Sequence, residues 1–134
     1  MQDTTTQLEI QLTDREKSLW YRLQFDLKKQ YGKKPDMNAL LFLVGMNELG
    51  IVREFSKQEK MDLMHIATCK LLSYEGHFVF SYKDEDGWPH YEQKSRPPYG
   101  DLLNQELLLR RLLVRYFDES GFFETEAAPA DNTH

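Results

Sequence analysis

The segment from Met37 to Gly50, MNALLFLVGMNELG, constrains the fold most because it is apolar on almost every side of a helix. A helix that is apolar all round is normally buried among other elements rather than lying on a surface. The apolar run is far shorter than the roughly 20 residues needed to cross a bilayer. Asn47 and Glu48 also interrupt it. We therefore expect a buried central helix here and no membrane span.

Three further helices are predicted from capping signals and apolar periodicity. Two pairs, Thr13 with Glu16 and Ser56 with Glu59, match the capping box. In this motif each side chain accepts a hydrogen bond from the backbone N–H of the other residue. Asp101 can cap a leucine-rich helix. With the central helix, the expected ranges are 13–32, 36–50, 56–76 and 101–117.

Two other segments have the period of a strand. Aromatic residues alternate at positions 78, 80 and 82, and Asp86-Gly87 is a turn dipeptide, so a short β-hairpin or irregular extended segment is predicted near 78–92. Leu8, Ile10 and Leu12 alternate with polar residues, which predicts a short edge strand or an extended arm.

The predicted fold class is therefore mainly α, with about four principal helices around a buried central helix. A chain of 134 residues that is 40% hydrophobic can bury a core without disulfides or metals. We expect one helical domain over 1–123, with residues 1–7 frayed. Residues 124–134 contain nothing large enough to bury, so they are expected to form a disordered C-terminal tail.

A reducing, cytoplasmic location is expected because Cys69 is the single cysteine and no signal peptide is visible. The net charge of −5 argues against a general polyanion binder. The charge is uneven, however, because residues 1–60 hold 10 basic and 9 acidic side chains, whereas residues 61–134 hold 7 and 13. Any nucleic-acid contact is therefore expected in the N-terminal half.

No residue pattern specifies a metal, a cofactor or a catalytic site. His65 and Cys69 are four residues apart on one predicted helix, but a structural zinc site needs four ligands. Asp84, Asp86 and Gly87 do not match the register of a calcium loop, so a tight turn is the better interpretation. Cys69 lies within a helix, where nothing activates its thiol, and is expected to be an inert core residue.

The best candidate binding surface combines large aromatic rings with a histidine and an arginine, which are residue types enriched at protein interfaces. It consists of Trp88, His90, Tyr91, Arg96 and Tyr99. The competing interpretation is that these rings plug one end of the helical bundle. Both interpretations stay open at this point.

The segment from Asp84 to Glu92, DEDGWPHYE, and the leucine-rich helix from Asp101 to Phe117 resemble a group of small uncharacterised bacterial proteins. These proteins carry a similar turn followed by Trp-Pro-His and an aromatic residue. The resemblance implies a small soluble cytoplasmic protein and brings no activity, cofactor or catalytic residue with it.

The expected function is a protein-interaction module that self-associates, for instance as a homodimer, and has no catalytic activity. The reason is that the predicted helix 101–117 carries a wider apolar arc than one neighbouring groove would cover. The expected partner is thus another protein or a second copy of the chain.

A nucleic-acid-binding regulator is the alternative, because an alternating segment followed by two helices resembles the ribbon-helix-helix order. The polar positions of that segment are not basic, but phosphates could be met by Lys28, Lys29, Lys33 and Lys34. An enzyme whose site is invisible in the sequence is the third interpretation.

Overall fold

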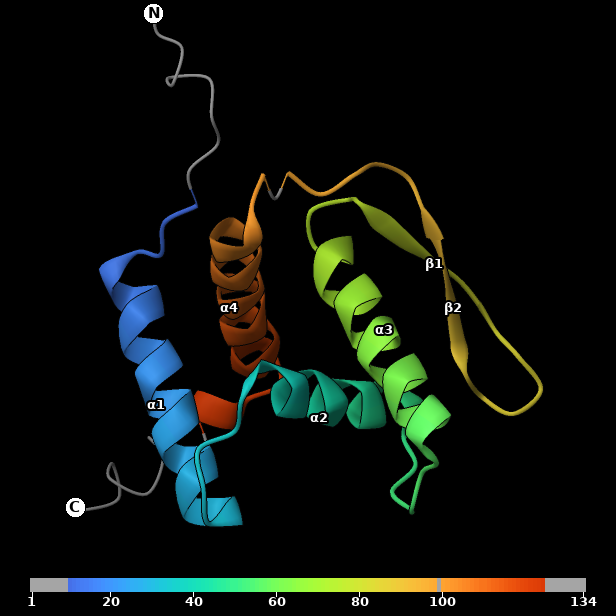
Figure 1. The fold of residues 1–134 in the computed structure, drawn as a ribbon, viewed down its shortest axis with the longest axis horizontal. Helices are drawn as coiled ribbons and strands as arrows, with labels where there is room; N and C mark the ends of the chain where they lie inside the picture. Colours follow the sequence, from blue (N-terminus) through green and yellow to red (C-terminus); the bar gives the residue numbers. More distant parts are fainter. Residues whose placement is uncertain (1–9, 99, 125–134) are drawn as a thin grey trace, which may run out of the picture. The chain divides into compact units, whose positions relative to one another are not determined.

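The computed structural model describes residues 10–98 and 100–124, and it is mainly α-helical with one antiparallel hairpin (Figure 1). The element order is α1 (Asp14–Tyr31), α2 (Met37–Leu49), α3 (Lys57–Ser73), β1 (Phe78–Lys83), β2 (Pro89–Gln93) and α4 (Leu102–Glu119). A short helical stretch follows at 122–124. The prediction of four principal helices and a hairpin near 78–92 is confirmed.

The helices begin where the capping signals predicted them. Both capping boxes form, at Thr13 for α1 and at Ser56 for α3. The side chains of Asp36 and Asp101 accept backbone N–H bonds at the starts of α2 and α4. Because these side chains satisfy N–H groups that have no partner inside the helix, each start is fixed by local sequence.

The chain forms two compact units, Met1–Lys33 with Pro98–His134, and Lys34–Pro97. The first contains α1 and α4, which pack against each other. The second contains α2, α3 and the hairpin, with α3 in contact with α2 and with both strands.

In the first unit, polar contacts join α1 and the segment before it to α4 and the segment after it. The backbone N–H of Ile10 donates to Oδ1 of Asn104 at 3.0 Å. The guanidinium of Arg22 donates to the carbonyl oxygen of Phe123 at 2.8 Å and lies over its ring. The packed side chains are apolar: Trp20, Leu23, Leu27, Leu108, Leu109, Leu112 and Leu113 are all buried.

Residues 10–12 precede α1 and are neither helix nor strand. Ile10 and Leu12 are buried while Gln11 is exposed, so the alternation predicted from the sequence is present in the burial pattern. The edge-strand interpretation is therefore wrong for these residues, and the N–H of Ile10 donates to the side chain of Asn104 rather than to a neighbouring strand. Leu8 lies outside the described residues. So do the predicted frayed segment 1–7 and the predicted tail 124–134, apart from Glu124, which is the last residue of the short helical stretch.

In the second unit, α2 is largely but not completely buried. Leu41 and Val44 are 8% and 0% exposed, as expected for a central helix. Phe42, on the same helix, is only partly buried and packs against a cluster that contains Leu49 and Phe55. Its ring meets Phe55 edge-on, with the ring centroids 6.1 Å apart.

The contact between α2 and α3 depends on a glycine within α2. Gly45 is buried and has ordinary helical geometry, so its role is steric rather than conformational. A Cβ atom at this position would overlap the carbonyl oxygen of Leu63 and lie 2.9 Å from the Leu63 Cβ. The absence of a side chain therefore lets the two helix backbones approach each other closely.

We expect Gly45→Ala to lower the free energy of unfolding by about 1–3 kcal/mol, as overpacking in a well-packed core does. Urea denaturation followed by circular dichroism measures this. The sign is diagnostic, because glycine to alanine at an open helical position would instead stabilise the protein by up to about 1 kcal/mol. Asn38→Ala, at an exposed position of the same helix, is the control and should change stability little. A stabilised Gly45→Ala protein would contradict the close contact.

Candidate functional site

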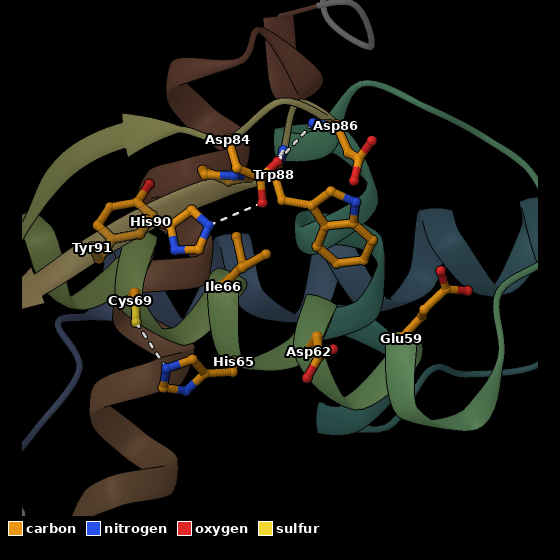
Figure 2. Close-up of a pocket in the computed structure, with 11 residues that line it drawn as sticks. Glu59, Asp62, His65, Ile66, Cys69, Asp84, Asp86, Trp88, His90 and Tyr91 are labelled. Atoms are coloured by element: carbon orange, nitrogen blue, oxygen red, sulfur yellow. Dashed lines mark hydrogen bonds and ion pairs between the residues drawn. The ribbon is translucent and has the colours of Figure 1, made fainter.

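A hollow of about 500 Å³ lies between α3 and the hairpin (Figure 2). Its lining combines acidic, imidazole and aromatic side chains. Helix α3 contributes Glu59, Asp62, His65, Ile66 and Cys69, and the hairpin contributes Asp84, Asp86, Trp88, Pro89, His90 and Tyr91. The second unit alone therefore builds the hollow.

The α3 wall follows from helical spacing. Glu59, Asp62 and His65 recur every three residues, so their side chains project from the same side of the helix, as Figure 2 shows. Leu63 and Ala67 of the same helix are fully buried. Helix α3 thus buries one side and presents acids and a histidine to the hollow with another.

Cys69 is the last of the α3 residues that line the hollow, and its side chain is buried, at 3% exposed. Its Sγ lies 3.5 Å from Nε2 of His65. Burial raises the pKa of the Cys69 thiol to about 11, because a thiolate would lose its hydration there. The thiol is therefore neutral at physiological pH, in agreement with the expected inert core residue. No three His, Cys, Asp or Glu side chains in 10–98 and 100–124 are arranged to hold a metal ion.

Asp84 holds the hairpin turn together. Its Oδ1 accepts the backbone N–H groups of Asp86 at 2.9 Å and Trp88 at 3.0 Å. Its carbonyl oxygen accepts the N–H of Gly87, whose φ of 89° is in the left-handed region that favours glycine. The turn predicted from Asp86-Gly87 is confirmed.

The second oxygen of Asp84 binds His90 across the hairpin, with Oδ2 3.0 Å from Nε2. Ionised carboxylates only accept hydrogen bonds, so Nε2 carries the hydrogen. This bond from His90, followed by the backbone N–H of Trp88, holds the pKa of Asp84 below its ordinary value. The carboxylate therefore stays ionised at neutral pH.

A β-bulge places His90 opposite an aromatic ring. The register runs from Phe78↔Gln93 to Phe80↔Tyr91, and shifts between Phe80 and Tyr82 so that Tyr82 pairs with His90. The rings of Tyr82 and His90 are stacked, with centroids 4.6 Å apart and planes inclined by 2°. His90 is thus fixed by a hydrogen bond at one ring atom and by stacking on one face.

Trp88 and Tyr91 have features of both interpretations made from the sequence. Each is partly buried and packs against the cluster of Leu49, Phe55 and neighbouring residues, as a plug would. Trp88 meets Phe55 edge-on at 6.5 Å between centroids. Both residues nevertheless line the hollow, and burial raises the pKa of the Tyr91 hydroxyl to about 12.

Two other candidate residues were selected from the sequence, Arg96 and Tyr99. Arg96 is exposed and is not among the described residues that line the hollow, and Tyr99 lies outside the described residues. Sequence reasoning missed the acids at positions 59 and 62 as lining residues. Their three-residue spacing with His65 was a visible signal, but which element they face depends on tertiary packing.

Glu59 also has a lowered pKa, first because of the side chain of Arg53 and then because of the backbone N–H of Ser56. Arg53 bridges to Glu59 at 3.2 Å and its guanidinium lies over the ring of Phe55. At neutral pH this carboxylate is therefore ionised and part of its charge is balanced.

Comparison of the chain with protein-family models, with curated proteins and with solved structures gave no match. The resemblance of 84–92 to small bacterial proteins therefore stays a prediction. None of the helices within 10–98 and 100–124 is both long and apolar enough to span a membrane.

We expect His90→Phe to raise the pKa of Asp84 toward the ordinary value of about 3.9. Phenylalanine keeps a ring to stack on Tyr82 and removes the hydrogen bond to Oδ2, which is the largest cause of the lowered pKa. A carboxyl ¹³C titration measures the Asp84 pKa in both proteins.

The free energy of unfolding should change with pH in a way that follows from the Asp84 pKa. In the native protein the lowered pKa means that ionised Asp84 contributes stability above its ordinary pKa, and this contribution is lost as the pH falls through the lowered value. In His90→Phe the folded and unfolded pKa values of Asp84 lie closer together, so this contribution should be smaller and the free energy of unfolding should depend less on pH in the acid range. An unchanged Asp84 titration would show that His90 does not set the charge of this residue.

Proposed function

We propose that this protein is a small interaction module and that a partner protein binds in the hollow between α3 and the hairpin. The observation that supports this most is that Trp88, His90 and Tyr91, selected as binding residues from the sequence, line the same hollow. Concave sites with an apolar wall and a few convergent polar groups are typical of ligand binding.

The lining favours a positively charged partner group. Four carboxylates, those of Glu59, Asp62, Asp84 and Asp86, line the hollow together with Trp88, and the described lining includes no Lys or Arg. Arg53 pairs with Glu59 and His90 binds Asp84, so Asp62 and Asp86 are the acids best placed to meet a partner's cation. A lysine or arginine side chain could pair with the carboxylates while its aliphatic stem or guanidinium lies against the indole ring. We therefore propose that the partner presents a basic segment.

The hairpin turn that lines the hollow is held in place by hydrogen bonds. The carboxylate of Asp84 accepts the backbone N–H groups of Asp86 and Trp88 and the Nε2–H of His90, and these bonds fix the turn before any partner arrives. A preorganised surface loses less conformational entropy on binding than a mobile loop.

The basic peptide acetyl-Lys-Arg-Lys-amide tests this proposal, and the neutral peptide acetyl-Gln-Gln-Gln-amide is its control. We expect the basic peptide to shift the indole N–H signal of Trp88 in ¹H–¹⁵N spectra, with an affinity that falls as salt is added. Asp62→Asn and Asp86→Asn should each weaken binding by roughly twofold to fivefold, the usual effect of an exposed ion pair.

Glu85→Gln is the matched control, because Glu85 is exposed in the same turn but is not among the described lining residues. It should leave the affinity unchanged. Equal effects of Glu85→Gln and Asp86→Asn would mean that overall charge, not this hollow, attracts the peptide.

Self-association is a second proposal. The exposed apolar surface of α4 is smaller than the wide apolar arc predicted from the sequence. Most of the apolar arc of α4 is buried, including Leu108, Leu109 and Leu112. Leu102 and Leu103, in its first turn, are 82% and 66% exposed. We propose that copies of the chain meet through these two leucines.

Sedimentation velocity at micromolar concentration measures the self-association. We expect the wild-type chain to form dimers and a double variant, Leu102→Ser with Leu103→Ser, to be monomeric, because serine removes the exposed apolar surface. Both positions are exposed, so the variant should fold normally. A monomeric wild-type chain would contradict the proposal.

Four further parts of the interpretation are also proposals. The arrangement of the helices around α2 and the cytoplasmic location are supported by the apolar sequence of α2 and by the single buried cysteine. Nucleic-acid binding through Lys28, Lys29, Lys33 and Lys34 is the alternative function, and all four side chains are exposed. An enzymatic role is the third.

A further inference from the structure

A second hollow, of about 270 Å³, lies in the unit that contains α1 and α4. We propose that it binds a small organic anion that carries its negative group on a flat apolar body. This inference is independent of the proposed partner site, because the two hollows share no lining residue among those described.

Three segments build the walls of this hollow. The segment before α1 contributes Leu12, α1 contributes Lys17 and Trp20, and α4 contributes Leu107 and Arg110. The spacing of three residues between Lys17 and Trp20, and between Leu107 and Arg110, places each pair on one side of its helix. The bond from the Ile10 N–H to Asn104 fastens the segment before α1 to α4.

The lining combines apolar and cationic side chains. Trp20 is 4% exposed and Leu12 is 9% exposed, so both belong to the core, whereas Tyr21 in the same lining is 65% exposed and offers a flat group the larger apolar surface. The guanidinium of Arg110 lies over the Trp20 ring, 5.2 Å from its centroid. An aromatic ligand could therefore contact apolar atoms while its charged group reaches the cations.

The charge of this lining is opposite to that of the whole chain. Lys17 and Arg110 line the hollow, and the described lining contains no Asp or Glu, although the chain carries a net charge of −5. Glu106 pairs with Nε of Arg110 at 2.9 Å and balances part of its charge. A guanidinium has five N–H donors, so Arg110 can donate to a second anion at the same time.

Lys17 therefore supplies most of the net positive charge. It is exposed on α1 and flanks the buried ring of Trp20, so its ammonium group can reach an anion without the loss of a core contact. A partly enclosed site next to an apolar surface strengthens such a charge contact relative to bulk water.

The test uses four probes: 2-naphthoate, 2-naphthyl phosphate, the neutral 2-naphthylmethanol and inorganic phosphate. We expect both naphthyl anions to shift the indole signal of Trp20 and the amide signal of Lys17 in ¹H–¹⁵N spectra. The alcohol should bind several-fold more weakly because it lacks the charge, and inorganic phosphate should bind weakly because it lacks the ring. The order of naphthoate and naphthyl phosphate identifies the preferred anionic group.

The indole signal of Trp88 is an internal reference in the same spectra, because Trp88 lines the other hollow. A basic peptide that fails to shift Trp88 would reject the proposed function and leave this inference intact. Naphthyl anions that fail to shift Trp20 would reject this inference alone.

Lys17→Gln should weaken naphthoate binding by about fivefold and leave naphthylmethanol binding unchanged. Lys28→Gln is the matched control, because Lys28 is an exposed lysine of the same helix that is not among the described lining residues. Both variants change surface positions, and thermal unfolding verifies that they fold. Equal binding of naphthoate and its alcohol, or equal effects of the two lysine variants, would overturn the inference.

Discussion

The close contact of α2 with α3 at Gly45 is the constraint on which the second unit depends. Because the backbone of α2 reaches Leu63 there, α3 directs its apolar residues to α2 and leaves another side for the hairpin. That other side carries Glu59, Asp62 and His65, which line the hollow. Because Gly45 has no side chain, α2 packs closely on one side of α3, and the polar residues on another side of α3 stay available to a ligand.

The hairpin is held both by polar bonds in its turn and by two aromatic rings that pack on a small apolar cluster. The carboxylate of Asp84 accepts two backbone N–H groups of the turn and also binds the ring of His90. One side chain therefore fixes both the backbone path and an imidazole. A two-stranded hairpin is marginally stable on its own. Here Trp88 and Tyr91 anchor it to the cluster around Phe55, which explains why the same rings are partly buried and partly available.

The helices could be predicted from the sequence because their signals are local. A cap such as Thr13 with Glu16 acts over three residues, and the structure places both bonds there. The hollow could not be predicted in the same way, since it joins α3 to a turn that begins more than ten residues later in the chain. Asp84 was assigned to the turn correctly, but its bond to His90 depends on a bulge near Ser81 that no sequence pattern revealed.

The distribution of charge links the two hollows to the sequence. Acidic residues predominate after residue 60, and Asp62, Asp84 and Asp86 of the first hollow come from that part of the chain. Lys17, from the more basic N-terminal part, gives the second hollow its positive character. Because the contacts are partly exposed, salt would screen both. A chain with one modest net charge can therefore present two sites of opposite sign, and its net charge alone is a poor guide to what it binds.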